Sequence, residues 1–214
     1  MSDELVFYTH PMSRGRIVRW MLEEIGRPYR TEVLDYGTSM KSADYLAINP
    51  MGKVPAIVHD GTVVTETAAI CAYLADAFPQ AGLAPAPGSA LRGTYYRWLF
   101  FGAGPLEAAA TNKALGVAVP PERRGMVGYG SIEEVTRILE AAVDGRSFLV
   151  GDRFSAADVY VGSHIAWGMM FGTLEKRPAF ERYWAGLAVR PAERRATEID
   201  DALGKDHPMP GAPG

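Results

Sequence analysis

The chain has 214 residues, of which 48% are hydrophobic, and a formal net charge of -3 with a pI near 5.8. This length is enough to bury a sizeable core, in one large domain or two small ones. The slightly acidic balance argues against nucleic-acid binding, because proteins that neutralise phosphates carry an excess of Lys and Arg. The single cysteine, Cys71, rules out an internal disulfide and fits a reducing compartment.

The start of the chain, Met-Ser-Asp-Glu, lacks the positive region and the apolar stretch of a secretory signal peptide. No apolar run reaches the roughly 18 residues that a membrane-spanning helix needs. The chain also has no Cys-x-x-Cys pair for zinc binding or dithiol chemistry. We therefore expect a cytoplasmic protein that requires no metal and binds neither membrane nor nucleic acid.

The first 80 residues alternate strand patterns with helix patterns. Apolar side chains recur every three to four positions in the helix candidates, and short β-favouring runs lie between them. The Asp60-Gly61 pair between two apolar runs is a strong hairpin signal. The order β-α-β followed by β-β-α predicts a thioredoxin-like α/β domain. The expected strands are residues 5–8, 29–34, 55–59 and 63–65, and the expected helices are residues 17–25, 42–48 and 69–78.

The remainder of the chain carries helix signals only, which predicts an all-helical second domain. A change to proline, glycine and alanine marks a linker before it. Ser131 with Glu134 has the spacing of a helix-opening capping box, and so has Ser155 with Asp158. Helices are also expected over residues 91–110, 178–189 and 191–203. We predict a first domain over residues 1–80, a linker over 81–90, the helical domain over 91–204 and a mobile tail over 205–214.

Three segments contain the residue types from which chemistry can be expected. Each lies where a predicted strand meets a helix or loop, which is a common place for binding residues. The segments are His10-Pro-Met-Ser13-Arg14-Gly-Arg16, Asn49-Pro-Met-Gly-Lys53-Val54-Pro55 and Thr65-Glu66-Thr67.

Each segment has an ordinary structural interpretation beside a functional one. Pro55 either begins a strand after a trans bond, or forms a cis bond that turns the Val54 backbone outward to pair with a peptide-like ligand. Glu66 and Thr67 either cap a helix, or hold the two charges of an α-amino acid end at its N-terminus. Ser13 is either an N-cap or a hydrogen-bond donor to a thiolate.

Together the three segments resemble the N-terminal domain of the glutathione transferase family, and the resemblance covers residues 4–203. It implies a thioredoxin-like domain, an all-helical domain, a homodimer and an active site in the cleft between the domains. The residues that carry it are Asn49-Pro-x-Gly-Lys-Val-Pro55, Glu66-Thr67-x-Ala-Ile70, Phe154-Ser-x-x-Asp158 and Pro178-Ala-Phe-x-x-Tyr-Trp with Arg190-Pro191 and Ala196.

The resemblance also implies which residues bind glutathione. Val54, next to Pro55, would pair with the cysteinyl backbone of glutathione, and Glu66 with Thr67 would hold its γ-glutamyl end. Lys41 and Lys53 would face the glycyl carboxylate, although either lysine can equally be a solvated surface residue.

The activating residue is less sharply indicated. His10-Pro-x-Ser13 resembles the serine-type branch, which implies Ser13 as the hydroxyl that donates to the thiolate. Arg14-Gly-Arg16 resembles the tyrosine-type branch instead, but His10 stands at the tyrosine position. We predict Ser13, with His10, Arg14 and Tyr8 as rivals; Tyr8 lies inside a predicted strand and is expected to be structural.

The implied activity is detoxifying glutathione transfer, in which the thiolate of glutathione attacks an electrophilic, mostly apolar second substrate. The sequence is also compatible with two other functions. The same site would serve a glutathione-dependent peroxidase or disulfide reductase, and the fold would also serve a non-enzymatic interaction protein. No motif in the sequence indicates the second substrate.

Overall fold

A computed structural model of the chain describes residues 4–209, which form two compact units. The first unit comprises residues 4–81 and 190–209, and the second comprises residues 82–189. The first unit therefore contains both described ends of the chain. The boundaries inferred from the sequence differ in this respect, because they assign residues 191–204 to the helical domain.

The first unit is built on a four-stranded mixed sheet with the strand order β2-β1-β3-β4. Strand β1 (Leu5–Thr9) runs parallel to β2 (Arg30–Val33) and antiparallel to β3 (Ala56–His59), which pairs antiparallel with β4 (Thr62–Thr65). The parallel pair is joined by helix α1 (Gly15–Ile25), as expected of a βαβ unit. This arrangement confirms the predicted thioredoxin-like domain.

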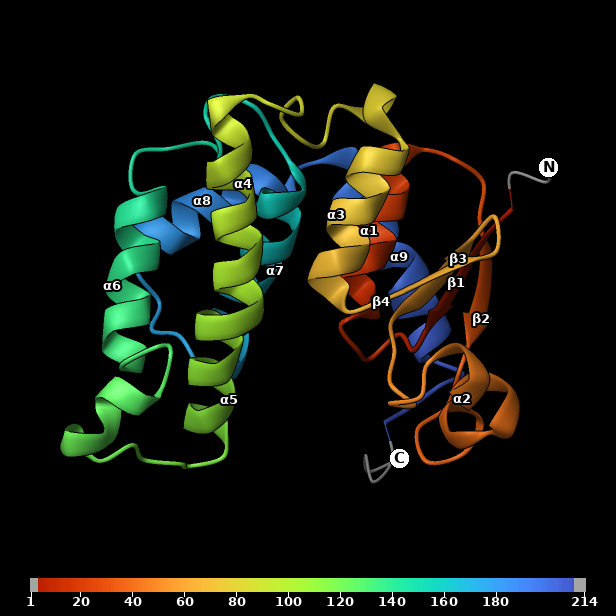
Figure 1. Cartoon of the computed structure of the whole chain (residues 1–214), viewed down its shortest axis with the longest axis horizontal. Coiled ribbons are helices and arrows are strands. Elements are labelled where there is room, and N and C mark those ends of the chain that lie inside the picture. Colours follow the sequence, from red (N-terminus) through yellow and green to blue (C-terminus); the bar gives the residue numbers. More distant parts are fainter. Residues whose placement is uncertain (1–3, 210–214) are drawn as a thin grey trace. The chain divides into compact units, whose positions relative to one another are not determined.

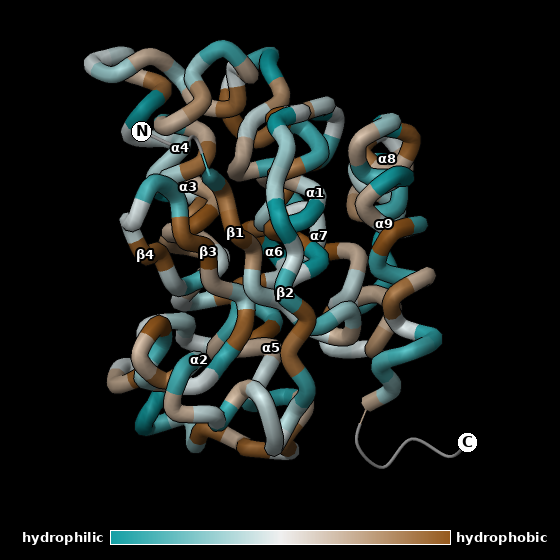
Figure 2. Tube along the Cα trace, turned by 90° about the vertical axis from the view of Figure 1, so that its right-hand side faces the viewer, coloured by the Kyte–Doolittle hydropathy of each residue, from teal (hydrophilic) through white to brown (hydrophobic). Residues whose placement is uncertain are grey.

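Helices α1 and α3 (Thr67–Ala77) run side by side in this unit, whereas α2 (Ala43–Ile48) lies apart from them (Figure 1). The apolar face of α1 is buried against the sheet, and the strands β1 and β3 beneath it are largely hydrophobic (Figure 2). Helix α1 ends where Gly26 adopts a left-handed φ of 68° and donates its N–H to the Leu22 carbonyl.

Helix α9 (Pro191–Gly204) packs against α1, which explains why the end of the chain belongs to the first unit (Figure 1). Four ion pairs link residues 190–201 to α1, and none of them is visible as a local sequence pattern. They join Arg190 to Glu24, Arg195 to Glu23, Asp200 to Arg19 and Asp201 to Arg16. Of the tail predicted to be mobile, residues 205–209 follow α9 directly and residues 210–214 lie outside the described residues.

The second unit is helical, as predicted. The single helix expected over residues 91–110 is interrupted by a π-helical stretch, Gly102–Leu106, that contains Pro105. A proline inside a helix removes one backbone donor and clashes with the preceding turn, so the ladder shifts locally. The α-helices of this unit are α4 (Ala90–Phe101), α5 (Glu107–Ala114), α6 (Ile132–Val143), α7 (Ala156–Phe171) and α8 (Pro178–Ala188).

Helix α7 opens with the predicted capping box. The Asp158 carboxylate accepts hydrogen bonds from the Ser155 N–H and the Ser155 hydroxyl, at 2.8 and 3.1 Å. Asp158 is completely buried. The same carboxylate accepts hydrogen bonds from the Leu149 N–H and the Tyr183 hydroxyl, both at 2.7 Å. Across residues 4–209, no helix has the length and apolarity needed to cross a membrane.

Candidate functional site

The register of the sheet brings the three sequence-predicted segments to one end of the first unit. Tyr8 of β1 pairs with Ala56 of β3, and Ala56 pairs with Thr65 of β4. Neighbouring strands lie about 4.8 Å apart. The turn after β1, the loop before β3 and the first residues of α3 therefore leave the sheet at the same end.

Val54 and Pro55 form the loop end that precedes β3, and the peptide bond between them is cis. Pro55 is buried, while Val54 is half-buried. Within residues 4–209, the backbone N–H and C=O of Val54 have no hydrogen-bond partner. The end of the sheet thus presents one backbone donor and one backbone acceptor to an incoming peptide-like group.

The loop that carries Val54 is fixed by side chains from α2 and its C-terminal end. The Tyr45 hydroxyl and the Asn49 amide both donate to the Lys53 carbonyl, at 2.5 and 2.8 Å. Burial raises the pKa of Tyr45 to about 12, so its hydroxyl remains a donor at neutral pH. Neither residue was predicted to have a role. Asn49 stands inside the motif that ends at Pro55, whereas nothing in the sequence singles out Tyr45.

Lys41 also holds this loop, because its ammonium donates to the carbonyls of Met51 and Gly52, at 3.1 and 2.8 Å. Gly52 has a φ of 56°, and a Cβ there would lie 2.8 Å from the Lys41 Nζ. Since an ammonium has three donors, one remains after these two bonds. Lys53 is exposed beside Val54.

Glu66 adopts a strained backbone conformation at the start of α3. Its φ of 67° lies in the left-handed region, which costs a residue other than glycine on the order of 1–3 kcal/mol. Its carbonyl accepts the first hydrogen bond of the helix, from Ile70 N–H at 2.8 Å, while its side chain is exposed and makes no capping bond. Thr67 follows as a buried residue.

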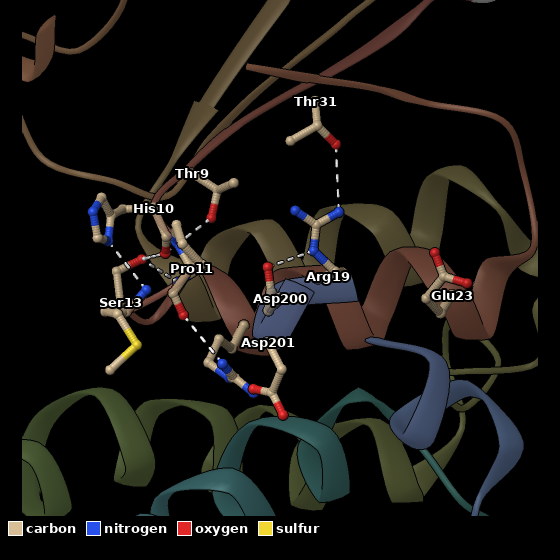
Figure 3. Close-up of polar contacts among 12 residues, drawn as sticks. Thr9, His10, Pro11, Ser13, Arg19, Glu23, Thr31, Asp200 and Asp201 are labelled. Carbon is tan, nitrogen blue, oxygen red and sulfur yellow. Dashed lines mark hydrogen bonds and ion pairs between the residues drawn. The ribbon is translucent and has the colours of Figure 1, made fainter. Parts of the chain in front are cut away.

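The turn between β1 and α1 brings His10 and Ser13 together (Figure 3). The Ser13 hydroxyl donates to the His10 carbonyl at 2.7 Å and accepts the Gly15 N–H at 2.9 Å. The Nδ1 of His10 accepts the Met12 N–H at 3.1 Å. An imidazole that accepts through Nδ1 carries its proton on Nε2, so His10 is a neutral ring with an Nε2–H donor.

His10 is only 1% exposed, and this burial lowers its pKa below the ordinary histidine value. The nearby Asp35 carboxylate raises that pKa, and His207 lowers it, each by less than burial does. The His10 ring also packs against the Tyr36 ring, with centroids 4.6 Å apart. The neutral form of His10 therefore prevails at neutral pH.

The other two candidate activating residues lie beside this turn. Arg14 is exposed and occupies the N-cap position of α1. Tyr8 lies inside β1, where its ring packs against Tyr45 at 5.5 Å. The helix itself begins at Gly15, where a Cβ would lie only 1.9 Å from the Thr9 Oγ1.

Potential metal ligands are not clustered in the described part of the chain. The described residues contain no group of three or more His, Cys, Asp or Glu that is placed to hold a metal ion. Cys71 is completely buried within α3, and that burial raises the pKa of its thiol far above the ordinary value. A protonated, enclosed thiol has no access to a substrate.

Comparisons with known proteins find relatives for both units of the chain. The family model for the glutathione S-transferase N-terminal domain matches residues 12–77, and that for the C-terminal domain matches residues 126–191. Glutathione S-transferase GST-4.5 of Xanthomonas campestris pv. campestris is 31% identical over 163 residues, which cover 73% of this chain and 76% of the relative. GstA of Escherichia coli O157:H7 is 31% identical over 162 residues, which cover 75% and 77%.

Solved structures with the same fold include two bacterial proteins. A glutathione transferase from Methylococcus capsulatus has a TM-score of 0.76 at 28% identity, over 92% of this chain and 99% of that one. A sphingomonad glutathione S-transferase complexed with glutathione has a TM-score of 0.75 at 28% identity, over 92% and 98%. Both similarities extend across nearly the whole of each chain.

Proposed function

The chain belongs to the glutathione S-transferase family of enzymes, and we propose that it activates glutathione as a thiolate, which attacks an electrophilic, mostly apolar second substrate. One observation carries this proposal. The unpaired backbone N–H and C=O of Val54 lie at the end of the sheet where the turn before α1 and the start of α3 also lie.

The proposed binding mode uses both ends of the tripeptide. Val54 forms a short antiparallel pair with the cysteinyl backbone of glutathione, while Glu66 holds the ammonium of the γ-glutamyl end and Thr67 its carboxylate. The N-terminus of α3 adds a favourable dipole for that carboxylate. Lys41, through its remaining donor, and Lys53 face the glycyl carboxylate.

Ser13 activates the sulfur in this proposal. Its hydroxyl hydrogen rotates from the His10 carbonyl to the thiolate, because a hydroxyl donor is free to turn, and its oxygen continues to accept the Gly15 N–H. The nucleophile is the sulfur of glutathione itself, so no side chain of the protein forms a covalent bond.

The hydrogen bond from Ser13 and the helix N-terminus together supply most of the free energy that this role requires. Lowering a thiol pKa from about 8.5 by about two units requires roughly 2.7 kcal/mol of preferential thiolate stabilisation. A hydrogen bond to a charged group supplies about 1.5–3 kcal/mol, and a helix N-terminus adds about 0.3–1 kcal/mol. Because the His10 carbonyl loses a donor in the exchange, the net gain from Ser13 lies towards the lower end of its range.

The direct test is an assay with the protein, glutathione and a chloronitrobenzene-type electrophile. We expect turnover above the uncatalysed rate. Turnover of a hydroperoxide or a mixed disulfide, without turnover of electrophiles, would instead identify a peroxidase or reductase. A protein that fails to bind glutathione at millimolar concentration by calorimetry would be a non-enzymatic member of the family.

A further inference from the structure

His207, in the segment after α9, meets the loop after β2 beside the His10 turn. The His207 Nδ1 lies 2.8 Å from the Asp35 Oδ1. The His207 ring also approaches the His10 ring edge-on, with centroids 6.3 Å apart and an interplanar angle of 78°. From the same loop, the Tyr36 hydroxyl donates to the Met12 carbonyl at 3.3 Å. Two chain segments far apart in sequence thus surround one imidazole.

Both members of the His207–Asp35 pair are held by their own backbones. The N–H groups of Asp206 and His207 donate to the Leu203 carbonyl, at 3.1 and 3.2 Å, so the segment continues the last turn of α9. The Asp35 N–H donates to the Ser39 hydroxyl at 2.7 Å. The contact with His10 is therefore made by two anchored segments.

We propose that His207, held by Asp35, is a positioning residue for thiolate activation. Its ring fixes His10, and the His10 carbonyl holds the Ser13 hydroxyl at 2.7 Å until that hydroxyl turns to the thiolate. The chain of contacts runs from Asp35 through His207 and His10 to Ser13. This inference rests on the proposed function, because it assigns a role in the reaction that Ser13 serves.

The charges around His10 give the proposal a distinctive signature. Asp35 and Tyr36 face His10 from the loop after β2, and His207 faces it from the segment after α9. Beside the turn lie Arg14 at the start of α1 and the Arg16–Asp201 pair, whose arginine also donates to the Pro11 carbonyl. Asp35 raises the pKa of His10, whereas burial and His207 lower it.

The first experiment follows the titration of the His10 ring by NMR in the full chain. His207 and burial both lower the pKa of His10, so we expect replacement of His207 by Ala to raise it. Asp35→Asn removes the carboxylate but keeps an oxygen acceptor for His207, so we expect the pKa of His10 to fall. Opposite shifts support the proposal. Two outcomes would overturn it. One is a rise in the pKa of His10 in both variants, as expected if the segment after α9 merely detaches; the other is an unchanged pKa of His10 in His207→Ala.

The second experiment measures steady-state kinetics. An edge-to-face ring contact of ordinary strength predicts that His207→Ala lowers kcat about two- to tenfold, with the KM for glutathione little changed. His207→Phe keeps a ring edge and should restore part of the rate. Lys205→Ala, two residues earlier and exposed, is the matched control and should leave kcat unchanged.

A double-mutant cycle separates this inference from the proposed function. In a His10→Ala background, His207→Ala should cause no further loss, because it acts through His10. An equal loss in both backgrounds would contradict the positioning role while leaving the transferase intact. If the wild type binds glutathione but turns over no electrophile, the proposed function fails, and the NMR shifts still decide whether His207 controls His10.

Discussion

The Nε of Arg19 lies 2.7 Å from the Oδ1 of Asp200, and each side chain is only 1% exposed, so an ion pair is buried between α1 and α9 (Figure 3). Arg19 also donates to the Tyr29 hydroxyl at 3.1 Å and lies over the Phe7 ring at 5.1 Å. Removing one partner of such a pair leaves a charge buried without compensation, which is far more costly than losing an exposed pair.

We expect Asp200→Asn to lower the free energy of unfolding by about 3–5 kcal/mol. The next residue provides a matched control, because Asp201 pairs with Arg16 at 2.6 Å but is 63% exposed. Asp201→Asn should cost no more than about 1 kcal/mol. Urea unfolding followed by circular dichroism measures the free energy of unfolding of both variants. Equal decreases would contradict a special energetic contribution from the buried Arg19–Asp200 pair.

We expect substitution by Ala to have opposite effects on stability at Gly15 and at Gly186. In an open helix position, Ala is more stable than Gly by about 0.8–1 kcal/mol. Gly186 in α8 has such open surroundings, so Gly186→Ala should stabilise the protein. Gly15→Ala should destabilise it by about 1–3 kcal/mol, because its Cβ would lie 1.9 Å from the Thr9 Oγ1. Thermal unfolding tests the pair, and recovery in the Gly15→Ala, Thr9→Ala double variant would confirm the cause.

We expect replacement of Ser13 to impair the activation of glutathione but not its binding. Loss of its hydrogen bond to the thiolate in Ser13→Ala should raise the pKa of bound glutathione by about one to two units and lower turnover, with affinity nearly intact. Ser13→Thr keeps the hydroxyl and should retain most of the activity. The pH dependence of kcat/KM measures the shift, and an unchanged profile in Ser13→Ala would move the role to His10, Arg14 or Tyr8.

We expect replacement of Glu66 to weaken the binding of glutathione but not its turnover. Glu66→Gln keeps the shape of the side chain but removes the charge that we propose to face the ammonium of glutathione, so the Kd should rise about ten- to a hundredfold while kcat is retained. Titration calorimetry measures the affinity, and Glu122→Gln, an exposed carboxylate in the other unit, is the control. A loss of turnover without a loss of affinity would contradict this role.

Most of the fold could be predicted because its signals are local. Apolar periodicity and turn residues predict β1 to β4 and α1 to α3, and the Ser155–Asp158 box marks the start of α7. The assignment of α9 to the first unit could not be predicted in this way. It depends on contacts such as Arg19 with Asp200, which are 181 residues apart and carry no periodic pattern.

The candidate site likewise has features that local sequence motifs predict and features that only the packed structure reveals. Its segments were recognisable as motifs, but their support was not: the Tyr45 hydroxyl on the Lys53 carbonyl and the left-handed φ of Glu66 follow from the packed structure. His207 stands in a glycine- and proline-rich tail, where a single histidine gives no signal. Only its position beside Asp35 and His10 reveals it.

We propose that glutathione is held with its sulfur beside Ser13 as a thiolate. The most direct measurement is the ultraviolet difference absorbance of the thiolate in the saturated complex, titrated against pH. We expect an apparent pKa of about 7 for bound glutathione, roughly one and a half units below that of a free thiol. A bound thiol that still titrates near 8.5 would contradict it.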